Sequence, residues 1–186
     1  MGKRVCPWWL GYFLVSPVRR FLEGDPGQLL RPFVREGMTV LEPGPGMGFF
    51  TLELARLVGP KGRVIAVDVQ PRMLTRLRRR AAEGGLSDRL DVRLAQSESM
   101  GLRDLKGKVD FTLAFSVVHE FPSAERFFAE VSQASKPGAA LLFVEPGGHV
   151  KPPEFEAELE AAAQAGLRVR DRLVIRRRLA ALLTKA

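Results

Sequence analysis

The chain is poor in the residues that form crosslinks or bind metals. Its 186 residues include one cysteine, Cys6, and two histidines. A lone cysteine excludes an intrachain disulfide, so we expect a reducing, cytoplasmic compartment. Cys6 lies among apolar residues and is interpreted as a small buried hydrophobe. No metal site is predicted, since the four residues that could form one follow no ligand spacing: His119, Glu120, Glu145 and His149.

The sequence also lacks an apolar run long enough to cross a membrane. Residues 5–15, "VCPWWLGYFLV", follow a basic start and imitate a secretory signal, but Pro7 and two tryptophans interrupt them. No small-x-small cleavage site follows, and the run is too short to span a bilayer. We therefore expect this segment to remain in the mature protein.

Acidic residues are outnumbered. There are 21 Asp and Glu against 29 Lys and Arg, which gives a net charge of +8. This balance permits an anionic partner such as nucleic acid or an acidic lipid surface, but an arginine-rich soluble surface is the favoured interpretation. The arginines of 76–80 fit the outer face of a helix. Those of 168–172 fit an edge strand, where charge opposes edge-to-edge pairing.

Strand and helix patterns alternate after residue 37. The predicted strands are Met38–Leu41, 62–69, 89–94, 109–115, 139–145, 167–175 and 179–184. The predicted helices are 25–34, Phe49–Val58, Pro71–Glu83, Ser123–Ser135 and Glu154–Ala165. This alternation predicts an α/β fold with a mostly parallel sheet. The last two strands have too short a link for a crossover and must pair antiparallel.

A glycine-rich turn connects the first of these strands to the following helix. The stretch "VLEPGPGMGFFTLELA" places Gly44, Gly46 and Gly48 at alternate positions. Such a turn lets a ligand approach the backbone and the free N–H groups of a helix start. A dinucleotide fingerprint would need glycine where Phe49 stands, and the Lys-Ser/Thr of a Walker loop is absent. The nearby acid Glu42 instead suits a cationic ligand.

With its neighbours, this turn resembles the first motif of the class I S-adenosylmethionine-dependent methyltransferases. The segments "GRVIAVDVQPRML", "VDFTLAFSVVHEF" and "ASKPGAALLFVE" resemble later motifs of that family in the same order. The resemblance implies a Rossmann-like three-layer αβα sandwich of seven strands, with the last strand antiparallel. It implies one domain over 1–186, with its core at 38–186, and S-adenosyl-L-methionine as cofactor.

The same resemblance assigns the cofactor contacts. Asp68, at the end of the second strand, would accept hydrogen bonds from both ribose hydroxyls. The cofactor-binding residues it implies are Glu42, Gly44, Gly46, Gly48, Asp68, Val69, Met73, Ser97, Glu98 and Phe115. After the third strand, Ser97 stands where many relatives carry the acid that contacts adenine, and Glu98 follows it. Either side chain could make that contact, or Ser97 could cap a short helix.

The acceptor side of the site is expected after the fourth and fifth strands. His119 and Glu120 are the candidate catalytic residues, and Glu145 and His149 are candidate substrate contacts. Methyl transfer from a sulfonium needs a base only when the nucleophile arrives protonated. An imidazole could serve a hydroxyl or a thiol in this way, which makes His119 the first candidate.

The N-terminal segment 1–37 carries the remaining substrate-binding candidates. Its large aromatics could form a lid over the acceptor pocket; they are Trp8, Trp9, Tyr12 and Phe13. The alternatives are a homodimer interface or contact with a membrane surface.

The sequence lacks the marks of several nucleic-acid methyltransferases. The fourth strand is followed by "SVVHEF" rather than by Asn/Asp-Pro-Pro-aromatic, and no cysteine nucleophile lies near it. We therefore expect a small-molecule acceptor and no DNA. An RNA or protein acceptor is the alternative, and a non-catalytic S-adenosylmethionine-binding module is the third hypothesis.

Overall fold

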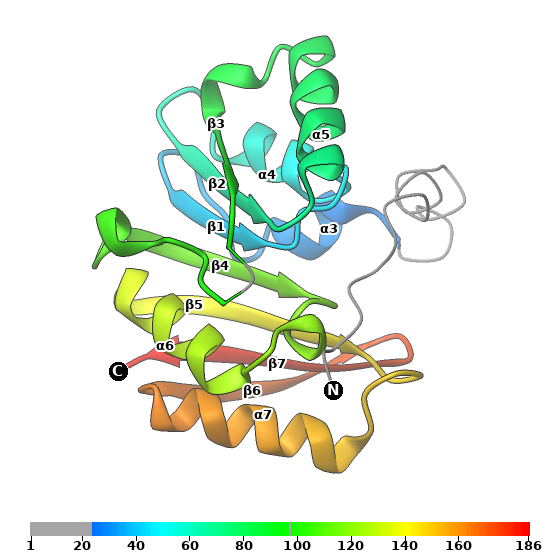
Figure 1. The fold of residues 1–186 in the computed structure, drawn as a ribbon, viewed down its shortest axis with the longest axis vertical. Coiled ribbons are helices and arrows are strands. Elements are labelled where there is room, and N and C mark those ends of the chain that lie inside the picture. The colour runs from blue at the N-terminus through cyan, green and yellow to red at the C-terminus, as the bar shows by residue number, and fades with distance from the viewer. Residues whose placement is uncertain (1–23, 97) are drawn as a thin grey trace. The chain divides into compact units, whose positions relative to one another are not determined.

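The computed structural model describes residues 24–96 and 98–186 of the chain. These residues form two compact units, 24–95 and 96–186, each with its own strands and helices (Figure 1). Cys6 and the N-terminal aromatics lie outside the described residues. The extent of the predicted single domain, 1–186, stays a prediction.

The first unit is a three-stranded parallel sheet with its helices. Its elements are α3 (Pro26–Leu30), β1 (Thr39–Pro43), α4 (Thr51–Leu57), β2 (Arg63–Asp68), α5 (Pro71–Glu83), the 3₁₀ turn η1 (Ser87–Arg89) and β3 (Leu90–Leu94). The strands run in the order β3-β2-β1, with Thr39 opposite Arg63 and Val64 opposite Leu90. Parallel pairing brings the carboxyl ends of β1 and β2 to the same edge of the sheet, where Pro43 lies opposite Val67 and Asp68 follows as the last residue of β2.

Helix α5 is strongly amphipathic and covers this sheet. Its buried face consists of Met73, Leu74, Leu77 and Ala81, as the 3.6-residue period predicted. Two of its arginines make contacts within the first unit. Arg78 donates to the carbonyl of Val92 at 2.7 Å, and Arg79 pairs with Glu83 at 2.8 Å.

The second unit contains the other four strands. Its elements are η2 (Arg103–Leu105), β4 (Val109–Phe115), η3 (Val118–Glu120), α6 (Ala124–Ala134), β5 (Ser135–Pro146), α7 (Pro152–Gln164), β6 (Leu167–Ile175) and β7 (Arg178–Lys185). The order is β4-β5-β7-β6; β4 and β5 are parallel, and β7 is antiparallel to both of its neighbours. The predicted α/β class, with a seven-stranded, mostly parallel sheet flanked by helices, is therefore confirmed.

A chain of aromatic rings forms much of the core of the second unit. Phe127 and Phe128 of α6 meet edge to face at 5.2 Å, and Phe128 meets Phe143 of β5 at 5.4 Å. Phe143 in turn stacks on Phe155 of α7 at 4.9 Å. All four rings are buried, and such pairs stabilise a core beyond their burial alone. They fix α6 and α7 against β5, the strand that ends in Glu145.

The structure extends some predicted elements. Strand β5 begins at Ser135, not at Ala139, because Ser135 already pairs with Val109 and the register then shifts before Ala140. Gly138, with φ of 77°, lies in this irregular stretch. Helix α7 starts at Pro152, since proline at a first helical turn costs no hydrogen bond.

Predicted helix caps are confirmed. Asp25 accepts a hydrogen bond from the N–H of Gly27 at 3.2 Å, and Ser123 accepts one from that of Arg126 at 3.1 Å. These bonds satisfy N–H groups that have no partner within a helix.

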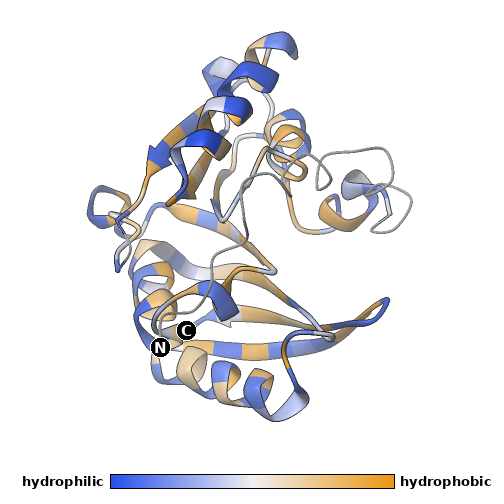
Figure 2. Cartoon of the chain, turned by 45° about the vertical axis from the view of Figure 1, so that its right-hand side comes forward, coloured by the Kyte–Doolittle hydropathy of each residue, from blue (hydrophilic) through white to orange (hydrophobic). Residues whose placement is uncertain are grey.

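The edge of the second unit is polar, as expected of β6. The hairpin between β6 and β7 ends in a hydrophilic tip (Figure 2), where the turn contains Arg176 and Arg177. Some of the side chains that alternate with the arginines along β6 are apolar. Val174, nearer the hairpin turn, is 95% exposed. Within residues 24–96 and 98–186, no helix combines the length and apolar character needed to cross a membrane.

Gly48 provides a test of how the glycine turn is held on α5. Its φ is +89°, and a Cβ built there would lie 2.5 Å from Cδ1 of the buried Leu77. We expect Gly48→Ala to lower the free energy of unfolding by about 1–3 kcal/mol more than Gly85→Ala. Gly85 is the matched control, since it also has positive φ, +64°, but open space around the added Cβ. Urea denaturation measures both, and equal losses would contradict the packing argument.

Candidate functional site

The glycine turn after β1 leaves open space beside its backbone. Gly44, Gly46 and Gly48 have φ values of 67°, 55° and 89°, a region that glycine adopts without strain. The N–H of Gly44 donates to the carbonyl of Val67 at 2.9 Å, which ties the turn to β2. A Cβ added at Gly46 would meet no atom within 4 Å. Gly46 thus borders a space where a ligand can approach the main chain, whereas Gly48 packs on α5.

Asp68, the last residue of β2, is the acid that is hydrogen-bonded to this turn. It is only 9% exposed, and its Oδ2 accepts a hydrogen bond from the N–H of Gly46 at 3.3 Å. Its Oδ1 accepts one from the N–H of Gln70 at 2.9 Å. Burial raises the pKa of Asp68, while the N–H groups of Gln70, Gly46 and Val69 act to lower it. The carboxylate is therefore held rigidly beside the turn.

Arg80 of α5 binds the same turn through a second hydrogen bond. Its Nη1 donates to the carbonyl oxygen of Met47 at 2.5 Å, one residue after Gly46. Burial is the main cause that lowers the pKa of Arg80, with the charge of Arg76 adding to it. The sequence interpretation placed Arg80 on the outer face of its helix. Its spacing of three residues from buried Leu77 was the available signal that it could reach inward.

Three further predicted cofactor residues lie in the first unit. Glu42 is buried on β1, Val69 is half-buried after β2, and Met73 is buried on the core face of α5. Their contacts with a cofactor stay predictions.

In the second unit, the end of β4 has an unusual backbone. Ser116 has φ of 56°, rare for a residue with a side chain, and its N–H donates to the carbonyl of Val144 at 2.7 Å. Arg178 of β7 donates from Nη1 to the Ser116 hydroxyl at 2.8 Å. The guanidinium of Arg178 also lies 4.6 Å from the ring centre of Phe115, a predicted cofactor residue. The sequence interpretation missed Arg178, since its position next to the hairpin turn carried no such signal.

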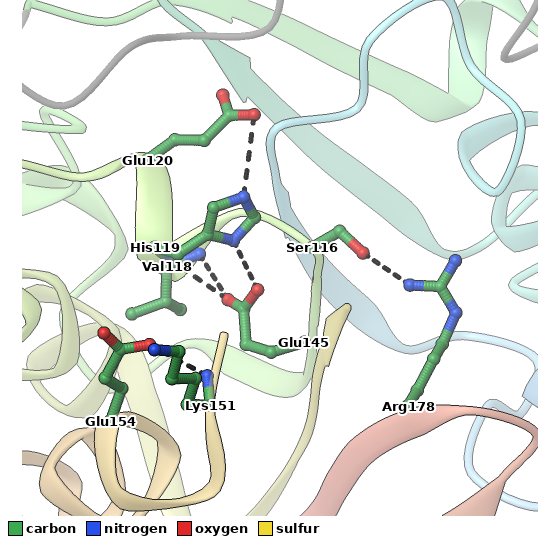
Figure 3. A network of polar contacts seen from close by, with 8 residues as sticks. All are labelled: Ser116, Val118, His119, Glu120, Glu145, Lys151, Glu154 and Arg178. Atoms are coloured by element: carbon green, nitrogen blue, oxygen red, sulfur yellow. Dashed lines mark hydrogen bonds and ion pairs between the residues drawn. The ribbon is translucent and has the colours of Figure 1, made fainter. Parts of the chain in front are cut away.

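The most closely connected polar group in the second unit joins His119 to Glu145 (Figure 3). Glu145 has no exposed surface, and its Oε2 lies 2.5 Å from Nδ1 of His119. Its Oε1 accepts hydrogen bonds from the N–H of Val118 at 2.8 Å and of His119 itself at 3.3 Å. The sequence placed these residues at neighbouring strand ends. It could not show that the carboxylate turns inward onto the imidazole.

The charge around His119 is negative. Its Nε2 lies 4.0 Å from Oε1 of Glu120, and its ring stacks on that of His149 with 6.3 Å between the ring centres. Burial acts to lower the pKa of His119, but the hydrogen bond and charge of Glu145 and the charges of Glu120 and Glu158 outweigh it. The pKa of His119 is therefore raised above its usual range, and the imidazolium is favoured.

The remaining predicted residues are placed as follows. Glu98 is exposed and pairs through Oε2 with Arg126 at 2.6 Å, and its adenine contact stays a prediction. Ser97 and the lid candidates Trp8, Trp9, Tyr12 and Phe13 lie outside the described residues. Within the described part of the chain, no three His, Cys, Asp or Glu side chains gather in a way that could hold a metal ion.

Comparisons with known proteins agree with these features. A family model described as a methyltransferase domain matches residues 34–173. The fold is similar to the crystal structure of an S-adenosylmethionine-dependent methyltransferase from Aquifex aeolicus. That match has a TM-score of 0.85 and 27% identity, and it covers 98% of this chain and 100% of the Aquifex chain.

Two curated relatives match a shorter part. An arsenite methyltransferase from Halobacterium salinarum is 31% identical over 105 residues, which are 56% of this chain and 26% of the relative. The ubiquinone/menaquinone biosynthesis C-methyltransferase UbiE from Hahella chejuensis is 29% identical over 112 residues, 60% of this chain and 44% of the relative. The matched region thus spans less than half the length of either relative.

The family model covers well over half of the chain, and the strand order agrees with the fold that the motifs implied. The resemblance to the class I S-adenosylmethionine-dependent methyltransferases is thereby confirmed, and the chain belongs to the methyltransferase-domain family.

Proposed function

We propose that this chain binds S-adenosylmethionine and transfers its methyl group to a small molecule. The observation that carries the proposal is the pairing of Asp68 with the glycine turn. A buried carboxylate and a backbone N–H meet beside open space at Gly46. The Aquifex protein, similar over its whole length, is named as S-adenosylmethionine-dependent, which supports the same cofactor here.

The residues of the first unit fit such a cofactor chemically. Asp68 offers two carboxylate oxygens to the hydroxyls of a ribose, as the acid after the second strand does in nucleotide-binding folds. Glu42 and Asp68 together make the end of the sheet acidic, which suits a cation more than a phosphate. When bound, S-adenosylmethionine supplies a methyl group already activated on a sulfonium. The chain's own task is then to position the reactants and to manage protons.

The small-molecule acceptor is proposed on two grounds. The curated relatives are named for arsenite and for ubiquinone and menaquinone biosynthesis, which are small-molecule chemistry. The arginines of α5 and of the β6 edge have structural contacts of their own, with Val92, Glu83 and Glu156 among their partners. The net charge of +8 therefore does not require an RNA acceptor.

An assay with methyl-labelled donor tests the acceptor class. The protein is incubated separately with a small-molecule extract, total RNA and total protein, and label is followed in each fraction. We expect label in the small-molecule fraction and only weak, salt-sensitive binding of RNA. Specific label in RNA or protein, with none in small molecules, would reverse the order of these hypotheses.

Replacement of Asp68 tests the donor site. Asp68→Asn keeps the shape but removes the charge and one acceptor, so we expect the dissociation constant for S-adenosylmethionine to rise about 30- to 150-fold, roughly 2–3 kcal/mol. Calorimetric titration measures it, and circular dichroism checks that the fold persists. Asp88→Asn, an exposed acid of the same unit, serves as control. An unchanged dissociation constant in Asp68→Asn would remove this residue from the site.

Replacement of Arg80 tests whether donor binding needs the hydrogen bond from Arg80 to the turn in addition to the one between the turn and Asp68. Arg80→Ala removes the bond to the Met47 carbonyl, and we expect donor affinity to fall about 10-fold because a bond from a charged donor is lost. Arg80→Lys should restore part of the affinity. Arg79→Ala is the matched control, since Arg79 is exposed and pairs only along its own helix with Glu83 in the described contacts. Equal affinities of the Arg79→Ala and Arg80→Ala variants for the donor would show that the hydrogen bond from Arg80 to Met47 does not matter for binding.

A further inference from the structure

We infer that His119, oriented by the buried Glu145, is the general base of the reaction, and that the acceptor presents an acidic X–H group, a thiol or a phenol-like hydroxyl. This inference rests on the proposed methyl transfer and deepens it. It also reassigns Glu145. The sequence interpretation made this residue a substrate contact, whereas a carboxylate with no exposed surface acts here as a positioning residue.

Glu145 fixes the imidazole in one orientation and one tautomer. Its two oxygens receive three donors, the N–H groups of Val118 and His119 on Oε1 and Nδ1–H of His119 on Oε2. Because Nδ1 holds the proton in that hydrogen bond, the lone pair of a neutral imidazole lies on Nε2. The backbone of η3 is bound by the same carboxylate, so ring and main chain are held together.

Nε2 is the ring nitrogen that can take a proton from the methyl acceptor. The His119 side chain is 25% exposed, and its Nε2 lies 4.0 Å from Glu120, beyond hydrogen-bond distance. A proton donor of the acceptor can therefore approach Nε2 without displacing the bond at Nδ1.

The surroundings stabilise the protonated ring once the proton has moved. Four titratable groups face His119, each from a different segment: Glu145 of β5, Glu120 of η3, Glu158 of α7 and His149 of the loop before α7. Three of them are acids, and they outweigh the burial of the ring. The resulting base is stronger than a free imidazole.

The transfer step moves one proton and two electron pairs. As the acceptor's X–H bond breaks, its proton passes to Nε2 and its electron pair forms the new bond to the methyl carbon. The electron pair of the carbon–sulfur bond stays on sulfur, which becomes a neutral thioether. His119 then carries the proton as an imidazolium paired with Glu145 and releases it to water.

The strength of this base limits the acceptor. A histidine has an ordinary pKa of about 6.5, a thiol about 8.5 and a phenol about 10. Proton transfer to His119 from these groups is uphill by a few units at most. An aliphatic hydroxyl resembles water, whose pKa lies far above that of a thiol or a phenol, so proton transfer from it to His119 is much more uphill. A neutral amine attacks with its own lone pair and needs no base before transfer. The pair therefore suits a thiol or a phenol-like hydroxyl.

A titration that needs no acceptor tests the pair directly. The chain has only two histidines, so their ring signals can be followed by NMR across pH in the wild type and in variants. We expect Glu145→Gln to lower the pKa of His119 and the exposed Glu160→Gln of α7 to leave it unchanged. If Glu145→Gln does not fold, Glu120→Gln decides, since it keeps the backbone bonds of Glu145 and should lower the same pKa. An unchanged pKa of His119 in folded Glu145→Gln would overturn the pairing, and an unchanged pKa in folded Glu120→Gln would overturn the claim that the surrounding acids strengthen the base.

The pH dependence of stability gives a second readout. A pKa raised in the folded state contributes stability below the unfolded value of about 6.5, and this contribution is lost as pH rises through the folded value. We therefore expect His119→Gln to destabilise the protein more at about pH 5.5 than at about pH 8.5. Equal destabilisation at both values would argue against a charged His119–Glu145 pair.

Transfer kinetics test the role as a base. Labelled donor is offered with thiophenol, phenol and benzylamine as probes. We expect transfer to thiophenol or phenol, a rate that rises with pH through the pKa of His119, and a loss of about 10²- to 10⁴-fold in His119→Gln. Donor binding in that variant should stay within about twofold of the wild type.

Two results distinguish a failure of the general-base inference from a failure of the proposed function. If the wild type binds donor but transfers to benzylamine alone, or if His119→Gln keeps the wild-type rate, the inference is overturned while the proposed function stands. If the wild type binds no donor, the proposed function fails, and the NMR titration still decides whether the His119–Glu145 pair exists.

Discussion

The first unit depends on one interaction, the hydrogen bond from the N–H of Gly46 to the buried carboxylate of Asp68. It joins the turn after β1 to the end of β2 and so sets where the open space beside Gly46 lies. Arg80 and Leu77 of α5 complete the support through the carbonyl of Met47 and the packing at Gly48. Without this support a glycine-rich turn would be free to adopt many conformations, and the entropy lost on binding would be correspondingly larger.

The second unit buries the carboxyl group of Glu145 completely. Glu145 is tolerated there because its oxygens receive three N–H donors, one of them from a ring that can itself be charged. The ring chain from Phe127 to Phe155 holds α6 and α7 on β5. The apolar packing of α6 and α7 on β5 therefore helps to fix the position of Glu145 at the end of that strand.

Much of the fold could be predicted because it depends on local patterns. Strand-forming runs, the caps Asp25 and Ser123, and the apolar face of α5 are set by neighbours within a few residues. The start of β5 was wrong because pairing with Val109 extends a strand through Lys-Pro-Gly, and pairing is not local. In the site, glycine spacing identified the turn and Asp68. The inward turn of Glu145, the bond from Arg80 to Met47 and the bond from Arg178 to Ser116 join residues far apart in sequence, and no sequence pattern specifies them.

The proposed donor site, formed by the glycine turn and Asp68, binds a sulfonium nucleoside rather than a dinucleotide. Calorimetric titration of the unmodified chain with S-adenosylmethionine and, separately, with NAD tests it most directly. We expect saturable, one-to-one binding of S-adenosylmethionine and no heat of binding with NAD, because the third glycine stands at Gly48 and position 49 is phenylalanine. Tight binding of NAD with no response to S-adenosylmethionine would contradict it.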